Sequence, residues 1–282
     1  RIRDEHFAPA FDAGMAEQLT EVRTIADNPD APTFENTILA LETNGQTLGR
    51  AMRVFFNLVG TDTNDARKKL QAEFSPRFAA HRDAIMLDPA LFGRIQALYD
   101  QRATLGLDAE GVRLVERYHD DFVRAGARLS DADKVRLKEM NAQLATLGTQ
   151  FDQNVLNEVN ASAVTFDSAD ALAGSSDAQI AAAAAEAKKR GLDGKYVVTL
   201  LNTTGQPPLT YLEDRASRQK IFEASAARGS RGNEFDNTGI VSQVIKLRAE
   251  RAAMLGFPNH AAYSLADATA KTPEAVNAML GK

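Results

Sequence analysis

Residues 130–155, SDADKVRLKEMNAQLATLGTQFDQNV, carry the clearest helical pattern in the sequence. Ser130 can accept a hydrogen bond from the first turn of a helix, and Asp133 lies where a capping box has its acidic residue. Apolar side chains then recur at steps of three and four residues, which places them on one helix face: Leu137, Met140, Leu144, Leu147, Phe151 and Val155. Because burying each contributes roughly 1.5–3 kcal/mol, we expect this face to pack against other elements.

Comparable patterns on both sides of this stretch predict a mainly α fold, an antiparallel array of helices. Thr33, Asp88 and Asp108 are residues of the N-cap type, and Pro89 suits the first position of a helix. Gly126 or Leu129 would end the helix that begins at Asp108. The predicted helices cover residues 7–25, 33–56, 88–99, 108–126, 130–155, 180–190, 212–227 and 240–255, and a last one begins at Thr272.

Two short segments rich in β-branched residues, 163–166 and 196–201, predict strands. Gly191 stops the alanine-rich helix between them, and residues 202–208 have the composition of a loop. The expected organisation is a helical array over residues 1–160, a small α/β insert over 161–210 and a helical continuation over 211–282, all in one structural unit.

The final helix has barely begun when the sequence stops. Val276, Met279 and Leu280 are its apolar positions, and a helix of about two turns is marginal without neighbours. We therefore expect the chain to be truncated at its C-terminal end. Such a piece should also expose apolar surface that a partner covers.

Composition narrows the function classes. The 282 residues are 44% hydrophobic and 25% charged, which is typical of a globular protein. The net charge of −5 argues against a nucleic-acid partner. No stretch approaches the ~20 apolar residues of a membrane span, so we expect no membrane partner. The absence of cysteine excludes disulfides, cysteine nucleophiles and thiolate metal sites.

The sequence offers no convergent set of catalytic, cofactor-binding or metal-ligating residues. None of the four histidines lies in a His-Glu-x-x-His motif. Glu116 and His119 have ligand spacing, but one such pair is too few for zinc, and we interpret it as part of a solvated charged helix face. Residues 228–232 (RGSRG) form a basic loop for which a surface turn is favoured over a binding site.

One pattern does suggest a function. Gln143, Gln150, Asn154 and Asn157 follow one another at steps of seven, four and three residues, which makes a stripe of uncharged amides beside the apolar stripe. Amides suit hydrated contacts such as a groove wall. Our hypothesis is that this amide face lines a channel or contacts another lobe; the alternative is an ordinary exposed flank.

The order of local motifs resembles that of the thimet-oligopeptidase family of zinc peptidases. The resemblance spreads over nearly the whole chain and rests on residues 6–12 (HFAPAFD), 32–42 (PTFENTILALE), 122–127 (FVRAGA), 200–204 (LLNTT), 255–258 (LGFP) and 270–275 (AKTPEA). Members of this family are mainly helical, two-lobed and roughly twice this length or more. Their zinc motif lies in the C-terminal half, and nothing in this sequence matches it.

The resemblance implies that this chain is the non-catalytic N-terminal region of such a peptidase, with the zinc in the full-length parent. The region would form channel wall and restrict access to short peptides, and it would be inactive alone. One branch of the family removes dipeptides from peptide C-termini. The implied partners are the C-terminal catalytic lobe and peptide substrates, and the implied compartment is the cytoplasm rather than the periplasm.

Two other functions stay open at this stage. The chain could be a free-standing helical module that binds peptides or regulates without peptidase activity. It could also be an enzyme of another class that uses scattered carboxylates with Arg228 or Arg231. A gene that continues for several hundred residues and includes His-Glu-x-x-His would favour the peptidase.

Overall fold

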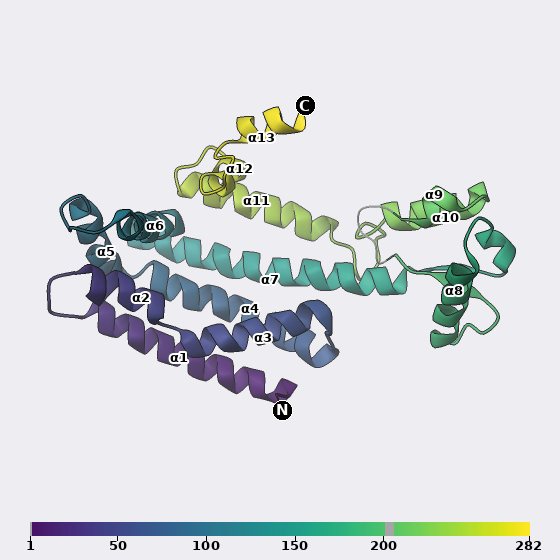
Figure 1. Cartoon of the computed structure of the whole chain (residues 1–282), viewed down its shortest axis with the longest axis horizontal. Coiled ribbons are helices and arrows are strands. Elements are labelled where there is room, and N and C mark those ends of the chain that lie inside the picture. The colour runs from purple at the N-terminus through teal and green to yellow at the C-terminus, as the bar shows by residue number, and fades with distance from the viewer. Residues whose placement is uncertain (1, 201–205) are drawn as a thin grey trace. The chain divides into compact units, whose positions relative to one another are not determined.

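The computed structural model describes residues 2–200 and 206–282, and it confirms the mainly α fold (Figure 1). The elements in chain order are η1 (Asp4–His6), α1 (Phe7–Ala26), η2 (Phe34–Leu39), α2 (Ala40–Thr43), α3 (Gln46–Thr61), α4 (Asp65–Met86), α5 (Pro89–Gln101), α6 (Ala109–Ala125), α7 (Asp131–Ala161), β1 (Val164–Phe166), η3 (Ala169–Leu172), α8 (Asp177–Lys189), β2 (Tyr196–Val198), α9 (Pro208–Tyr211), α10 (Arg215–Ala226), α11 (Thr238–Met254), α12 (His260–Leu265) and α13 (Pro273–Leu280).

The chain divides into two compact units. The first comprises residues 1–149 and 244–282, and the second comprises residues 150–243. α7 and α11 contribute residues to both units. No helix in the described ranges is both long enough and apolar enough to cross a membrane.

The predicted capping residues begin their helices as expected. The Ser130 hydroxyl accepts a hydrogen bond from the Asp133 amide at 3.1 Å, and the Asp88 and Asp108 carboxylates each accept one from the first turn of α5 and α6 at 2.8 Å. These bonds satisfy amides that have no partner inside the helix. Gly126 ends α6 in the left-handed region, with φ of 104°.

One buried cluster of the first unit consists mainly of aromatic rings. α1 packs against α3 and α4 (Figure 1), and the buried rings of Phe7, Phe11, Phe55 and Phe74 fill the space between these helices. The Phe11 ring lies 5.2 Å from that of Phe55 and 5.0 Å from that of Phe74, centroid to centroid. Contacts of this kind add to the hydrophobic contribution of each ring.

A buried arginine organises the segment before α2. Arg94 on α5 donates to the backbone carbonyls of Asn28 and Asp30 at 2.9 and 3.0 Å, and to the side chain of Asn36 at 2.8 Å. Its Nε donates to the buried Thr37 hydroxyl at 3.2 Å. These acceptors offset the cost of burying the charge. The guanidinium therefore holds the loop after α1 and the start of η2 in place.

The apolar face of α7 is only partly buried. Leu137 and Met140 pack against Leu87 in the core of the first unit. The expectation that the whole face would be buried is wrong at Phe151, whose side chain is 37% exposed. This residue belongs to the second unit, and its ring is absent from the apolar cluster of that unit.

The second unit is built around the small sheet. β1 and β2 are antiparallel, with Val164 opposite Val198 and Phe166 opposite Tyr196. The sheet packs with α8 and α10 over a buried cluster of Val159, Val164, Phe166, Leu172, Ala183, Leu200, Leu212 and Ile221. Both predicted strands are therefore confirmed, although β2 ends at Val198 and Thr199 and Leu200 are not part of it; residue 201 of the predicted strand lies outside the described residues.

Several boundaries differ from the prediction. The helix expected from Thr33 onward is interrupted at Gly45, which has φ of 65°, because a left-handed residue cannot continue a helix. The helix expected from Leu212 begins at Arg215, since Asp214 caps it. Of the predicted loop 202–208, residues 202–205 lie outside the described residues, and Pro208 already belongs to α9.

Candidate functional site

The amide face of α7 has two different halves. Gln143 and Gln150 are exposed, whereas Asn154 and Asn157 are half-buried. The Asn154 side-chain amide donates to the side-chain oxygen of Asn237 at 3.0 Å. Gln143 and Gln150 are therefore available to a ligand or another lobe, while Asn154 already makes a contact within the second unit.

Asn237 connects three segments of the second unit. It is buried, its backbone amide donates to the carbonyl of Gly229 at 2.8 Å, and its side-chain nitrogen donates to the carbonyl of Phe151 at 3.2 Å. Together with the bond from Asn154, these contacts attach the 228–237 loop to α7 immediately before α11 begins.

Glu158 is the other attachment of this loop. Residues 228–232 form a turn whose last three residues are exposed, as the sequence interpretation expected, but that interpretation missed the contact of the turn with Glu158. Glu158 is fully buried on α7. Its carboxylate accepts a hydrogen bond from the amide of Gly229 and forms an ion pair with Nε of Arg231 at 2.8 Å. Arg228 donates to the carbonyl of Leu200 at 3.1 Å. Arg231 of this loop thus supplies the counter-charge for a buried carboxylate.

A signal for this contact was present in the sequence. Glu158 occupies the next position of the apolar stripe, seven residues after Phe151 and three after Val155. A carboxylate in such a position is buried only if it has a cationic partner. Which arginine would provide the charge depends on the course of the intervening 70 residues, which local patterns do not predict.

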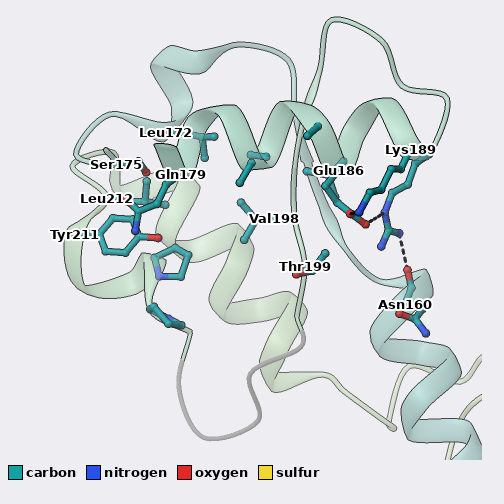
Figure 2. Close-up of a pocket in the computed structure, with 17 residues that line it drawn as sticks. Asn160, Leu172, Ser175, Gln179, Glu186, Lys189, Val198, Thr199, Tyr211 and Leu212 are labelled. Carbon is teal, nitrogen blue, oxygen red and sulfur yellow. Dashed lines mark hydrogen bonds and ion pairs between the residues drawn. The ribbon is translucent and has the colours of Figure 1, made fainter. Parts of the chain in front are cut away.

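A pocket of about 580 Å³ lies in the second unit (Figure 2). Figure 2 shows Leu172, Tyr211 and Leu212 toward one end of the pocket, and Glu186, Lys189 and Asn160 toward the other. The pocket therefore has an apolar part and a charged part. This combination is typical of sites that accept a polar molecule with an apolar group.

The charges at the polar end are largely matched. Glu186 forms ion pairs with Arg190 at 2.9 Å and with Lys189 at 3.6 Å, and Arg190 donates to the carbonyl of Asn160 at 2.7 Å. The hydrogen bond from Arg190, more than any other contact, lowers the pKa of the Glu186 carboxyl below its ordinary value. Burial raises the pKa of Tyr211 at the apolar end. These groups suit binding and positioning rather than proton transfer.

The histidines are dispersed, and one of them contradicts the sequence interpretation. His119 is buried rather than solvated, with its ring stacked on Tyr99 at 3.7 Å between centroids. Burial lowers its pKa. Its neighbour Glu116 instead pairs with Arg102 at 3.2 Å. Among residues 2–200 and 206–282, no group of three or more potential ligands is close enough together to hold a metal ion.

Comparison with known proteins shows which proteins this chain resembles. Residues 208–282 match the model of Peptidase family M3. The chain is 43% identical to the "Dipeptidyl carboxypeptidase" of Escherichia coli (strain K12) over 275 residues, which are 98% of this chain and 40% of that protein. It is 44% identical to the enzyme of the same name from Salmonella typhimurium, again over 98% of this chain and 40% of that protein.

A more distant relative covers the same region. The "Oligopeptidase A" of Haemophilus influenzae is 26% identical over 280 residues, 98% of this chain and 41% of that protein. The chain thus spans about 40% of the length of the curated relatives that it matches. These matches confirm the family resemblance that the local motifs indicated.

Proposed function

Since the chain is the N-terminal portion of an M3 peptidase, we propose that it is the non-catalytic part of a zinc metallopeptidase that removes dipeptides from the C-termini of short peptides. In this role it forms part of the wall of a substrate channel and restricts access to unfolded peptides. The observation that carries the proposal is the match to dipeptidyl carboxypeptidases over 98% of the chain.

The amide face of α7 is our candidate for the channel wall. Gln143 and Gln150 are exposed and uncharged, and their side chains can both donate to and accept from a peptide backbone. Such contacts tolerate many peptide sequences because they do not depend on the substrate side chains. A wall of this kind positions a peptide without taking part in the bond cleavage.

A catalytic lobe of the same protein is the partner that we propose for the exposed apolar side chains. In the first unit, Ile245 on α11 is 62% exposed, and Met279 and Leu280 on α13 are 63% and 74% exposed. Exposed groups of large apolar side chains are typical of surfaces that contact a partner. The apolar area supports a partner surface that buries it.

The described residues do not form a site that fits zinc. The described parts contain no set of side chains with the number and proximity of ligands that zinc needs. We therefore assign no zinc ligand and no catalytic step to residues of the chain. The chemistry of peptide-bond hydrolysis is proposed for the portion of the protein that carries a His-Glu-x-x-His motif.

We propose the cytoplasm as the compartment of the protein. The alternative is the periplasm, and cell fractionation would distinguish the two.

The test of the channel-wall role is a pair of substitutions in the complete peptidase. The double variant Gln143→Ala with Gln150→Ala should raise KM for peptides of five to ten residues about threefold to tenfold, because it loses one or two hydrogen bonds to the peptide. The value of kcat should stay unchanged. Arg136→Ala is the matched control, since Arg136 is an exposed residue of the same helix. Equal KM values for all variants would contradict the role.

A further inference from the structure

A second pocket lies in the first unit, among residues of α4, α6, α7, α11 and α12. Its volume is about 290 Å³. Four charged residues line it, namely Arg82, Asp83, Arg124 and Arg251. Three cations thus face one carboxylate, and the remaining described lining residues are neutral.

The single carboxylate does not neutralise this excess. Asp83 is buried, and both of its oxygens accept hydrogen bonds from the Asn141 side-chain nitrogen, at 2.9 and 3.1 Å. Burial, its largest influence, raises the pKa of Asp83 above the ordinary value. Arg251 contacts the other end of the same amide, donating from Nη1 to the Asn141 oxygen at 3.1 Å. Asn141 therefore separates the carboxylate from the guanidinium.

At this pocket, two buried guanidinium nitrogens lack a hydrogen-bond acceptor among the described residues, namely Nε of Arg251 and Nη1 of Arg124. Arg124 uses Nη2 to donate to the carbonyl of Tyr263 at 3.0 Å. Its Nη1 lies 3.7 Å from Asp267, too far for a hydrogen bond, and Asp267 is held more closely by Arg117 at 2.7 Å. Both guanidinium carbons lie 5.4 Å from the centre of the Tyr263 ring.

The titration of neighbouring groups reflects the same positive field. Burial is the largest influence on the pKa of Arg251 and lowers it; the charges of Arg248 and Arg82 lower it further, whereas Tyr263 and Asp83 oppose the shift. The pKa of His260 is lowered by burial and then by Arg248 and Arg251. Groups that already repel one another in a partly buried site are stabilised by a negative ligand.

We propose that this pocket binds a small oxyanion, a carboxylate or a phosphate group, which accepts hydrogen bonds from the guanidinium groups of Arg124 and Arg251. Guanidinium nitrogens are suited to oxyanions because their planar donors match two oxygens of such a group. Leu144, Leu255 and Ala145 also line the pocket. Their apolar side chains suit a short alkyl chain attached to a carboxylate.

The experiment measures ligand-dependent thermal stability of the 282-residue chain at constant ionic strength and pH 7. The probes are inorganic phosphate, isobutyrate and, as a neutral analogue of the same shape, isobutyramide. Phosphate or isobutyrate should raise Tm in a saturable way, since a ligand that binds only the folded state stabilises it, and isobutyramide should not. Stronger binding of isobutyrate than of phosphate identifies the organic carboxylate as the source of the anion, and the reverse identifies phosphate.

Arg124→Gln and Arg251→Gln should each weaken binding about tenfold or more. Arg136→Gln is the matched control, because it removes the same charge from an exposed pair with Glu250, and it should leave affinity within about twofold. If Arg251→Gln does not fold, an NMR titration of the unaltered protein replaces that variant. The signal of the Arg251 Nε–H should then shift when the anion is added. No Tm change with either anion up to about 50 mM, or an equal loss in Arg136→Gln, would overturn the proposal.

Discussion

The ion pair between Glu158 and Arg231 gives the sharpest prediction about stability. Glu158 is fully buried, whereas the Arg231 side chain is 26% exposed. Replacing Arg231 by alanine leaves a carboxylate in the protein interior without its counter-charge. The loss of one partner of a buried pair costs about 3–5 kcal/mol. We expect about 3 kcal/mol, the lower end, because water reaches part of the site through the position of Arg231.

Glu158→Gln should cost less than Arg231→Ala. The glutamine keeps an oxygen that can accept the hydrogen bond from Gly229, and the partly exposed Arg231 can be hydrated once its partner is neutral. We expect about 1 kcal/mol for this variant. The double variant should then be more stable than Arg231→Ala alone, since no buried charge remains. If the two substitutions acted independently, the double variant would instead be less stable than either single variant.

The assay is urea unfolding followed by circular dichroism of the helices, together with hydrogen exchange of the Gly229 amide as a local readout. Lys195→Ala is the control in the same unit. It removes an ion pair with Asp167 at 3.0 Å whose side chains are 47% and 88% exposed, and such pairs contribute little. Additive effects of the two substitutions, or a larger cost for Glu158→Gln than for Arg231→Ala, would refute the reasoning.

The remaining predictions concern a glycine and a histidine. Gly174→Ala should destabilise the second unit by about 2 kcal/mol or more, because φ is +91° and a Cβ would lie 2.0 Å from the carbonyl oxygen of Tyr211. Gly191→Ala should cost only about 1 kcal/mol, because Gly191 also has a positive φ, +71°, but open space around it. Equal melting temperatures for the two variants would be inconsistent with the close approach at Gly174. Burial lowers the pKa of His119 in the folded state. The neutral ring therefore stabilises the fold above about pH 6.5, the ordinary pKa of histidine in an unfolded chain. This contribution is lost as the pH falls toward the pKa of His119 in the folded state. His119→Phe, which retains a ring beside Tyr99, should therefore flatten the loss of stability as the pH falls below about 6.5. An unchanged slope in urea titrations at several pH values would show that His119 binds protons equally in the folded and unfolded states.

The local elements were predictable because their signals lie within a few residues. Ser130, Asp88 and Asp108 bond to amides three residues away, so the sequence alone contains both partners. The strand segments that became β1 and β2 carry their β-branched residues in one short run each. The thimet-oligopeptidase resemblance used the same kind of local information and was confirmed.

The helix α4 and the buried polar contacts were not predictable in the same way. α4 contains Pro76 and mixes charged with apolar residues, so it shows little amphipathic periodicity. Its stability depends on tertiary contacts, namely the packing of the buried Phe74 ring and the hydrogen bond from Asn141 to Asp83. The loop contact made by Arg231 with Glu158 joins residues more than 70 positions apart. Charge and spacing give no indication of which distant residues meet.

The proposal that this chain is the non-catalytic part of a peptidase is tested by measuring dipeptide release by two polypeptides. Each is given a short peptide with a free C-terminus and the same peptide with an amidated C-terminus. The first is this 282-residue chain, and the second is the polypeptide that joins it to the portion with a His-Glu-x-x-His motif. With zinc present, we expect the second to release C-terminal dipeptides from the free peptide only, and the first to release none. Release of dipeptides by the chain alone, free of contaminating peptidase, would contradict the account, as would a joined polypeptide that leaves the free peptide intact.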